Sequence, residues 1–285
     1  LAVALAVPVA PVRAAPPPGP GQGPGFLMVK LGDEAATPEM AADFLSRLGS
    51  WLGAHVSRFR GGDVEGWIAN REPEARRILE ERKPALAMVP AGVYLGHLRE
   101  GERAARPVAQ IPRFGARAER YYVVGPRNGP ASLEDLGGRA LRTVFSYPEP
   151  YLRRVVFPPG FRPGEAFRLE PAENLADEIF LLMEGGGDAP AAVLLDEELK
   201  RFFEEDDLVW PELRVIWTSD PLPRDLVVTL GEWSDDERAR LREDLFSMGE
   251  TAGGREILDL MDSSGFEPVN EELLGEAVKR YAAGP

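Results

Sequence analysis

The segment that decides the fold is LRVIWTSDPLPRDLVV, at residues 213–228. Its first six residues are rich in β-branched and aromatic side chains and predict a strand. The apolar run at residues 226–230 predicts another strand. We interpret residues 217–225, between them, as a return crossing from one α/β unit to another. The first unit is then discontinuous and is built from both ends of the chain.

Upstream, the chain alternates short apolar runs with helical patterns. Strands are predicted at residues 26–31, 55–60 and 84–89. Helices are predicted at residues 37–52, 63–83 and 91–99. The first of these helices begins with Thr37-Pro38-Glu39, which supplies a cap, a proline at the first helical position and an acidic first turn. Such alternation is typical of a mostly parallel sheet.

The pattern changes in the middle of the chain, where strands at residues 107–111 and 120–124 follow each other without a helix. Alternation then resumes, with predicted strands at residues 140–144, 167–169 and 191–195 and predicted helices at residues 147–157, 172–184, 197–205 and throughout 234–283. We therefore predict an α/β fold with two lobes, each a mixed sheet flanked by helices. Lobe one comprises residues 25–115 and 222–285, and lobe two comprises residues 116–221.

Composition excludes several classes of partner. The formal net charge of −14 argues against nucleic acid, because an acidic surface repels phosphates. It also argues against a basic membrane-docking patch. The chain has no cysteine, which excludes disulfides, thiolate metal sites and cysteine nucleophiles. A small-molecule ligand stays open, because a local site can differ in charge from the whole surface.

The first 24 residues predict an export segment. Residues 1–12 (LAVALAVPVAPV) form an apolar run that is too short to span a bilayer, and Val12-Arg13-Ala14 offers small residues at the positions that a signal peptidase reads. A Pro/Gly-rich spacer follows at residues 15–25. The alternative is an Ala/Pro-rich disordered leader. We predict a signal-peptide remnant and an exported, periplasmic protein.

The usual signatures of catalysis and metal binding are missing. The sequence holds no Gly-x-Ser-x-Gly, no Walker A loop and no Gly-x-Gly-x-x-Gly after a strand. Neither His55 nor His97 has a second histidine at helical spacing, so no zinc site is predicted. We expect neither a cofactor nor enzymatic activity, although an enzyme that uses carboxylates of the cleft stays open as an alternative.

Candidate ligand-binding residues lie in four loops that follow predicted strands. In open α/β sheets, ligands bind at the carboxyl ends of strands, where helix N-termini present free N–H groups. For each residue, ordinary turn and capping chemistry is the competing interpretation. The candidates are Asp33, Tyr94, Ser146, Tyr147, Thr218, Ser219 and Asp220.

Three segments give the chain a family resemblance. RKPALAMVPAGVYLGHLREG at residues 82–101 resembles the strand and Pro-Ala-x-x-Tyr helix of phosphonate-type solute-binding proteins. SLEDLGGRALR at residues 132–142 is similar to the turn that opens their second lobe, and residues 213–228 resemble their return crossing. The resemblance implies a type 2 periplasmic-binding-protein fold, a small ligand held by hinge closure, and delivery to the membrane permease of an ABC transporter. We further expect a monomer.

The resemblance also implies roles for particular residues. Tyr94 would line the lobe-one wall, Ser219 and Asp220 would lie near the hinge, and Ser146 and Tyr147 would begin a lobe-two helix. At that helix, phosphonate binders place a turn rich in Ser, Thr and Gly, whereas this chain reads FSYPEPY at residues 145–151. Two prolines without N–H groups and a glutamate predict weak binding of phosphate and phosphonates, unless Arg153 or Arg154 turns inward. A sensing or accessory protein without transport is the alternative function.

Overall fold

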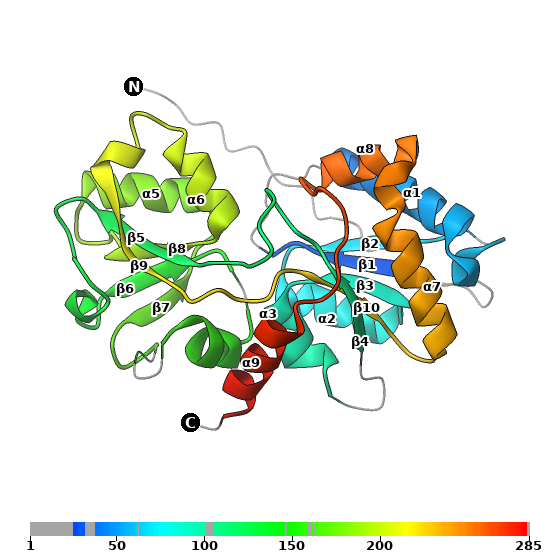
Figure 1. Cartoon of the computed structure of the whole chain (residues 1–285). Coiled ribbons are helices and arrows are strands. Elements are labelled where there is room, and N and C mark those ends of the chain that lie inside the picture. The colour runs from blue at the N-terminus through cyan, green and yellow to red at the C-terminus, as the bar shows by residue number, and fades with distance from the viewer. Residues whose placement is uncertain are drawn as a thin grey trace.

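The computed structural model describes residues 25–31, 38–61, 63–100, 105–145, 147–158, 161 and 163–283. These residues form two lobes side by side, each a sheet with helices packed on it (Figure 1). The predicted two-lobe architecture with mixed sheets is confirmed. The predicted export segment at residues 1–24, together with Asp33 and Ser146, lies outside the described residues.

The sheet of lobe one has the order β2-β1-β3-β10-β4. Its strands are β1 (Phe26–Val29), β2 (Gly66–Ala69), β3 (Leu86–Val89), β4 (Arg106–Gln110) and β10 (Leu226–Thr229). Strand β1 pairs in parallel with β2 and β3, whereas β10 returns from the other lobe and pairs antiparallel with β3 and β4. The first lobe is therefore built from both ends of the chain, as the 213–228 segment predicts.

Helices cover both faces of this sheet. They are α1 (Pro38–His55), the 3-10 helix η1 (Ser57–Phe59), α2 (Glu72–Glu81), α3 (Ala91–Val93) with the π-helix η2 (Tyr94–Leu98), α7 (Asp235–Phe246), the 3-10 helix η6 (Met248–Glu250), α8 (Ala252–Leu260) and α9 (Glu271–Ala282). Side chains alternate between the faces along each strand. Phe26 and Met28 pack in the same cluster as residues of α1, α7 and α8, whereas Leu27 and Val29 face α2 and α3.

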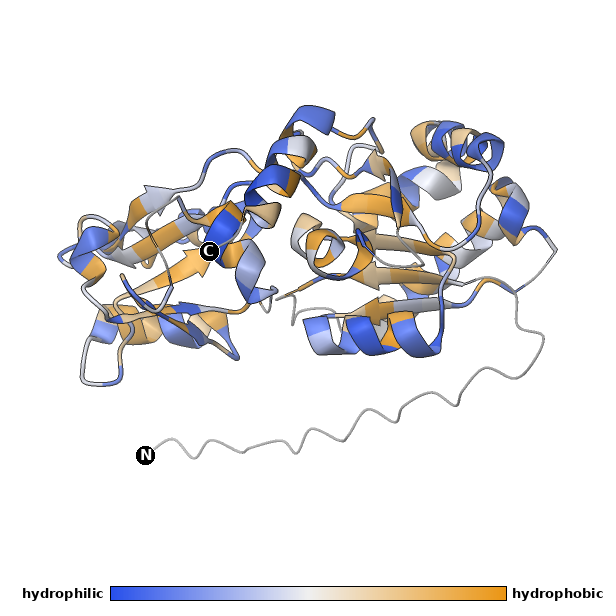
Figure 2. Cartoon of the chain, turned by 90° about the horizontal axis from the view of Figure 1, so that it is seen from below, coloured by the Kyte–Doolittle hydropathy of each residue, from blue (hydrophilic) through white to orange (hydrophobic). Residues whose placement is uncertain are grey.

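Lobe two repeats the plan with the sheet order β7-β6-β8-β5-β9. Its strands are β5 (Tyr122–Pro126), β6 (Ala140–Thr143), β7 (Arg168–Pro171), β8 (Ala192–Leu195) and β9 (Leu213–Thr218). Its helices are η3 (Glu134–Leu136), α4 (Glu149–Tyr151) with the π-helix η4 (Leu152–Val156), α5 (Leu175–Glu184), α6 (Glu197–Glu204) and η5 (Trp210–Glu212). In Figure 2 the strands of both lobes are largely hydrophobic, and the polar residues lie mainly on the helices and loops.

Two crossing segments, residues 111–121 and 219–225, connect the lobes. They hydrogen-bond to each other: the Glu119 N–H donates to the Leu222 carbonyl at 2.9 Å, and the Leu222 N–H donates back at the same distance. At the two ends, the Ser219 N–H donates to Tyr121 O at 2.8 Å and the Ile111 N–H to Asp225 O at 2.9 Å. The lobes are therefore joined by a short two-stranded connection, the geometry in which a few backbone torsions can absorb a hinge motion.

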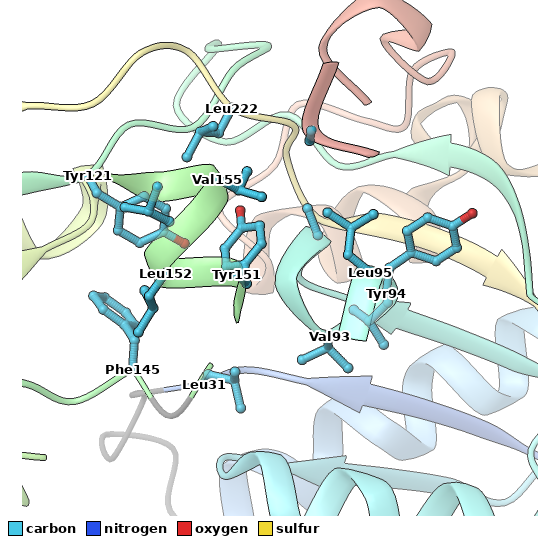
Figure 3. Close-up of a cluster of buried hydrophobic side chains, with 14 of the residues drawn as sticks. Leu31, Val93, Tyr94, Leu95, Tyr121, Phe145, Tyr151, Leu152, Val155 and Leu222 are labelled. Atoms are coloured by element: carbon cyan, nitrogen blue, oxygen red, sulfur yellow. The ribbon is translucent and has the colours of Figure 1, made fainter. Parts of the chain in front are cut away.

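A second contact between the lobes, here called the apolar seam, is formed by Gly92 and Gly96 of lobe one against Tyr147, Pro148 and Tyr151 of lobe two. A Cβ atom on Gly92 would lie 2.7 Å from Tyr151 Cδ1 and 2.8 Å from Tyr147 Cδ1, and one on Gly96 would lie 2.5 Å from Pro148 Cγ. Only glycine permits so close an approach of a helix to these rings. Figure 3 shows Tyr151 beside the side chains of both lobes, and the buried cluster continues across the boundary without a break.

Helix α9 reinforces the seam. It belongs to the chain after the second crossing, yet it packs against η4 of lobe two. Arg154 of lobe two donates to the Tyr281 carbonyl at 2.9 Å, and Arg280 donates to the Val155 carbonyl at 3.1 Å. The C-terminal helix, seen between the two lobes in Figure 1, therefore helps to hold them together beside the seam.

Three predictions of secondary structure were wrong. The tail is not helical throughout residues 234–283, because residues 261–270 between α8 and α9 are not helical and include a bridge from Glu267 to Gln110. The segment 55–60 is not a strand: α1 continues to His55, whose ring stacks on Trp51 at 4.6 Å, and η1 follows. Conversely, strand β2 lies inside the predicted helix 63–83. Gly66 is the reason for its position, because a Cβ there would lie 2.5 Å from Phe26 Cζ on the neighbouring strand. Pairing with β1 outweighs the helical spacing of Trp67 and Ile68 with the following helix.

Candidate functional site

A cavity of about 550 Å³ lies between the lobes beside the crossing segments. Lobe one contributes the ends of β1 and β3, the crossing segments contribute four charged residues, and lobe two contributes the loops after β6, β7 and β8. The lining residues are Val29, Lys30, Leu31, Pro90, Arg113, Glu119, Val144, Phe145, Tyr147, Asn174, Leu175, Ala176, Asp196, Glu198, Leu199, Phe202, Phe203, Arg224 and Asp225. This position, at the carboxyl ends of strands, is where open α/β sheets bind small ligands.

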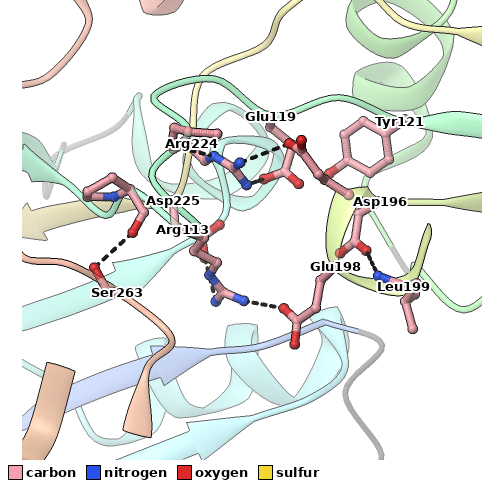
Figure 4. Close-up of polar contacts among 12 residues, drawn as sticks. Arg113, Glu119, Tyr121, Asp196, Glu198, Leu199, Arg224, Asp225 and Ser263 are labelled. Carbon is pink, nitrogen blue, oxygen red and sulfur yellow. Dashed lines mark hydrogen bonds and ion pairs between the residues drawn. The ribbon is translucent and has the colours of Figure 1, made fainter. Parts of the chain in front are cut away.

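Arg113 connects the first crossing segment to both the second crossing and lobe two. Its guanidinium lies 2.6 Å from the Glu198 carboxylate, on α6, and 3.0 Å from that of Asp225 (Figure 4). Burial disfavours its charge, but Asp225 and Glu198 outweigh that effect and raise the pKa of Arg113. Arg113 is therefore a fixed cation whose charge is balanced by two carboxylates.

Arg224 has an equivalent arrangement in the second crossing segment. Its side chain is 2% exposed, and its guanidinium lies 3.0 Å from Glu197 and 3.4 Å from Glu119. Its Nε also donates to the Ala116 carbonyl at 3.3 Å. Both arginines of the cavity are thus already paired with two carboxylates each.

Asp196 differs from the other cavity carboxylates, because no ion pair to it is found within the described part of the chain. It is the N-cap of α6, and its Oδ1 accepts the Leu199 N–H at 2.8 Å. Removal from bulk water raises the pKa of Asp196 to about 6, with Glu198 and Asp225 adding to the increase. Asp196 would consequently be stabilised as a carboxylate by a positive charge placed in the cavity.

The ionised form of Glu119 is also disfavoured by its surroundings, despite its arginine partner. Burial raises the pKa of Glu119 to about 8 against the opposing effect of Arg224, and Asp196 and Asp225 raise it further. The carboxylates around the cavity therefore repel one another in the absence of a ligand. Near neutral pH, part of this repulsion is relieved by protonation of Glu119.

The lobe-two wall is apolar and aromatic. Phe145 and Tyr147 stack at 5.7 Å, and the Tyr121 hydroxyl donates to the Tyr147 hydroxyl at 2.7 Å. Burial raises the pKa of both tyrosines well above the ordinary value, so they stay neutral phenols. Phe202 is 67% exposed and forms part of the lining with Phe203. A ligand in this cavity therefore meets both aromatic rings and charged groups.

Side-chain caps occupy part of the free N–H groups at the N-termini of α5 and α6, beside the cavity. Asn174 caps α5 and accepts the N–H groups of Ala176, at 2.8 Å, and Asp177, at 3.3 Å. Asp196 caps α6 in the same way, and α6 begins with two further glutamates. At α4 the N-cap is Pro148 and an N-terminal helical position is occupied by Pro150, neither of which has an N–H. These ends offer few donors to an oxyanion.

The predicted site residues are not gathered in one place. Tyr147 lines the cavity. Tyr94 is buried in lobe one and points away from Tyr121 and Tyr151 in Figure 3, Thr218 is exposed, and neither lines the cavity. Ser219 accepts the Tyr121 N–H at 3.0 Å within the crossing, and Asp220 pairs with Arg280 at 2.6 Å.

The charged residues of the cavity were missed. Asp196 follows a buried strand directly and precedes a helix. It therefore has the same position, at the carboxyl end of a strand, as the residues of the four candidate loops. Arg224 and Asp225 lie within the 213–228 segment itself. Arg113 and Glu119 had no comparable signal, because their partners are distant in the chain: 85 residues separate Arg113 from Glu198.

Known proteins share this architecture. XAC2383 from Xanthomonas citri bound to ATP has a TM-score of 0.69 and 15% sequence identity, over 90% of this chain and 96% of that one. The binding protein component of an ABC phosphonate transporter (PA3383) from Pseudomonas aeruginosa has a TM-score of 0.64 and 15% identity, over 91% and 88%. PhnD1 from Prochlorococcus marinus in complex with methylphosphonate has a TM-score of 0.62 and 12% identity, over 90% and 97%. A search of curated proteins found no match.

The fold is thus that of two-lobed, type 2 periplasmic binding proteins. A family model described as "ABC transporter, phosphonate, periplasmic substrate-binding protein" matches residues 35–274. The chain belongs to this family of substrate-binding proteins. Among the helices in the described ranges, none has both the length and the apolar character that a bilayer crossing requires.

Proposed function

We propose that this exported protein captures one small solute in the cavity between its lobes and presents it, unchanged, to the membrane permease of an ABC transporter. The observation that carries the proposal is the position of the cavity: both lobes and both crossing segments contribute to its wall. A ligand there touches each part that a hinge motion would move, so its binding selects the closed arrangement. The protein acts in the periplasm as a monomer, with the lobe boundaries predicted above as the units that move.

Binding rather than catalysis is supported by the partners of the buried carboxylates. Two carboxylates with raised pKa in one cavity also occur in enzymes that use acid–base catalysis. Here Glu119 pairs with Arg224 and Asp196 caps a helix, so each has a structural partner. We propose that they hold a ligand and take no part in bond making.

A ligand-sensing protein on the same fold is the second candidate. The apolar seam and α9 favour it, because their contacts between the lobes do not involve the cavity ion pairs. A sensor needs a ligand-dependent change but no cycle of capture and release. Small-angle scattering on the protein with and without ligand separates the two: transport requires an open form of larger radius in the ligand-free protein.

The experiment that tests capture itself is a thermal-shift screen of amines, oxyanions, sugars and amino acids, followed by NMR of the recovered compound. A ligand that binds the native state raises the unfolding midpoint in proportion to its affinity. We expect at least one compound to raise the midpoint and to be recovered unchanged. Conversion of the compound would show an enzyme, and a flat response to the whole panel would contradict solute capture.

A further inference from the structure

We infer that the solute is a small organic cation, with a protonated amine or guanidinium group held by Asp196 and Glu119 and a hydrocarbon part on the aromatic wall. The inference rests on the solute capture proposed above and names the class of solute that this cavity takes. A phosphonate binder would need a site for an anion instead. Four features of the cavity support the assignment of a cation.

The first feature is the charge balance. Lys30, Arg113 and Arg224 are the basic side chains of the wall, and the two arginines are each paired with two carboxylates. Four acidic side chains line the cavity against these three basic ones; they are Glu119, Asp196, Glu198 and Asp225. An oxyanion placed here would meet arginines that are already paired, with carboxyl groups close beside them.

The second feature is the cost to an oxyanion of using an arginine. To bind Arg113, an anion must displace Glu198, which lies 2.6 Å away and belongs to the same wall. The displaced carboxylate would remain close to the anion in a partly dehydrated cavity. An ammonium group requires no such exchange at Asp196, which has no cation to give up among the ion pairs of the described residues, whereas at Glu119 it would share the carboxylate with Arg224. Asp196 is therefore the natural first contact.

The third feature is that caps and prolines reduce the number of N–H donors at the N-terminal ends of α4, α5 and α6. A buried oxyanion needs several hydrogen bonds to replace its water. Asn174 and Asp196 occupy donors of α5 and α6, and Pro148 and Pro150 lack donors at α4. A cation needs acceptors instead, and carboxylate oxygens supply them.

The fourth feature is the shape and chemistry of the opposite wall. The cavity, at about 550 Å³, is large enough for a ligand with a hydrocarbon part. Phe145 and Tyr147 present stacked rings, and the faces of aromatic rings attract cations as well as carbon chains. Within the described ranges, no group of three or more His, Asp or Glu side chains is arranged to hold a metal ion. An organic cation fits this combination better than a metal ion.

Calorimetric titration with matched probes tests the inference. The cationic probes are agmatine and phenethylamine, the anionic probes are 3-phenylpropionate, methylphosphonate and inorganic phosphate, and 2-phenylethanol is the neutral isostere. We expect a cationic probe to bind at least tenfold more tightly than its neutral and anionic counterparts. Tighter binding of methylphosphonate or phosphate than of both amines would overturn the assignment while leaving solute capture intact. Binding of no probe at all would count against capture and assignment together.

Asp196→Asn is the decisive variant, since an asparagine can still cap α6 while the charge is lost. We expect the affinity for the cationic probe to fall roughly 10- to 100-fold, the loss of one charge-assisted contact. Asp259→Asn, at an exposed carboxylate on α8, is the matched control and should bind as the wild type does. Unchanged affinity in Asp196→Asn, with the fold intact by circular dichroism, would refute the role of this residue.

Discussion

The two lobes meet in two regions of opposite chemistry. The apolar seam is tightly packed, with Gly92 and Gly96 against the rings of Tyr147, Pro148 and Tyr151. The charged cavity is held by arginines between pairs of carboxylates, and its polar groups stay partly in contact with solvent. Packing is insensitive to pH and ligand charge, whereas ion pairs respond to both. The seam therefore limits how closely the lobes can approach each other. The charges of the cavity determine which ligand can stabilise the closed arrangement.

The largest effect should come from removing Arg224, because its buried guanidinium is the cation that pairs with the partly buried carboxylates of Glu119 and Glu197. We expect Arg224→Met to lower the free energy of unfolding by about 3–5 kcal/mol at pH 8, measured by urea denaturation. The loss should be smaller at pH 5.5, where Glu119 is protonated.

Arg117→Met is the matched control for that experiment. Arg117 lies in the same crossing segment and pairs with Glu267 at 2.9 Å, but its side chain is 74% exposed. Its loss should change the free energy of unfolding by less than about 1 kcal/mol. Equal effects of the two substitutions would show that the cavity pairs are no more important than surface pairs.

The seam is tested by adding one methyl group to it. Gly92→Ala puts a carbon atom against two buried rings, and we expect a loss of roughly 1–3 kcal/mol in stability and a larger radius of gyration by small-angle scattering. Gly253→Ala, in α8 with no heavy atom within 4 Å of the new carbon, should instead gain up to about 1 kcal/mol. If both substitutions stabilise the protein, the lobes do not pack as described.

The pH dependence of the free energy of unfolding tests the contribution of the cavity carboxylates. Glu119 and Asp196 have folded-state pKa values of about 8 and about 6, above those of unfolded carboxylates. Groups with a raised pKa stabilise the fold fully below the unfolded pKa, and this contribution is lost as pH rises through the folded pKa. We therefore expect the ligand-free protein to lose stability between pH 5 and pH 8.5. Glu119→Gln should flatten this slope, and an equal slope in the variant would contradict the assignment.

The smallest effect is expected at the edge of the seam. Arg280 pairs with Asp220, which is 67% exposed, and also donates to the Val155 carbonyl. Arg280→Ala should cost about 0.5–1 kcal/mol in the free energy of unfolding, because solvent screens the ion pair. A loss above about 3 kcal/mol would show that α9, rather than the glycine contacts, holds the lobes together.

The fold was more predictable than the site. Alternating apolar runs marked most strands, and the return crossing at residues 213–228 predicted the discontinuous lobe, because both depend on local patterns of the chain. Strand β2 was missed because its pairing with β1 and the tight contact at Gly66 depend on residues 40 positions away.

The site depends on long-range contacts to a greater degree. Tyr147 could be found from its place after a strand, and Asp196 could have been found by the same rule. The ion pairs could not, since Arg113 and Asp225 are 112 residues apart and become partners through the crossing of two segments. The family resemblance pointed to an oxyanion, and the sequence at residues 145–151 already predicted that such a ligand would bind weakly. The charged residues of the cavity favour the organic cation proposed above.

The number of protons released or taken up on binding tests most directly whether the solute is a cation held by the cavity carboxylates. Near pH 7 Glu119 is largely protonated in the ligand-free cavity, so a cation that favours the carboxylate form must release protons when it binds. Titration calorimetry of agmatine or phenethylamine at pH 7, in phosphate-free buffers of different ionisation enthalpy, measures this number. We expect net proton release when the amine binds to the wild-type protein, and no proton release when it binds to Glu119→Gln. Proton uptake on tight binding of methylphosphonate, with no binding of either amine, would contradict it.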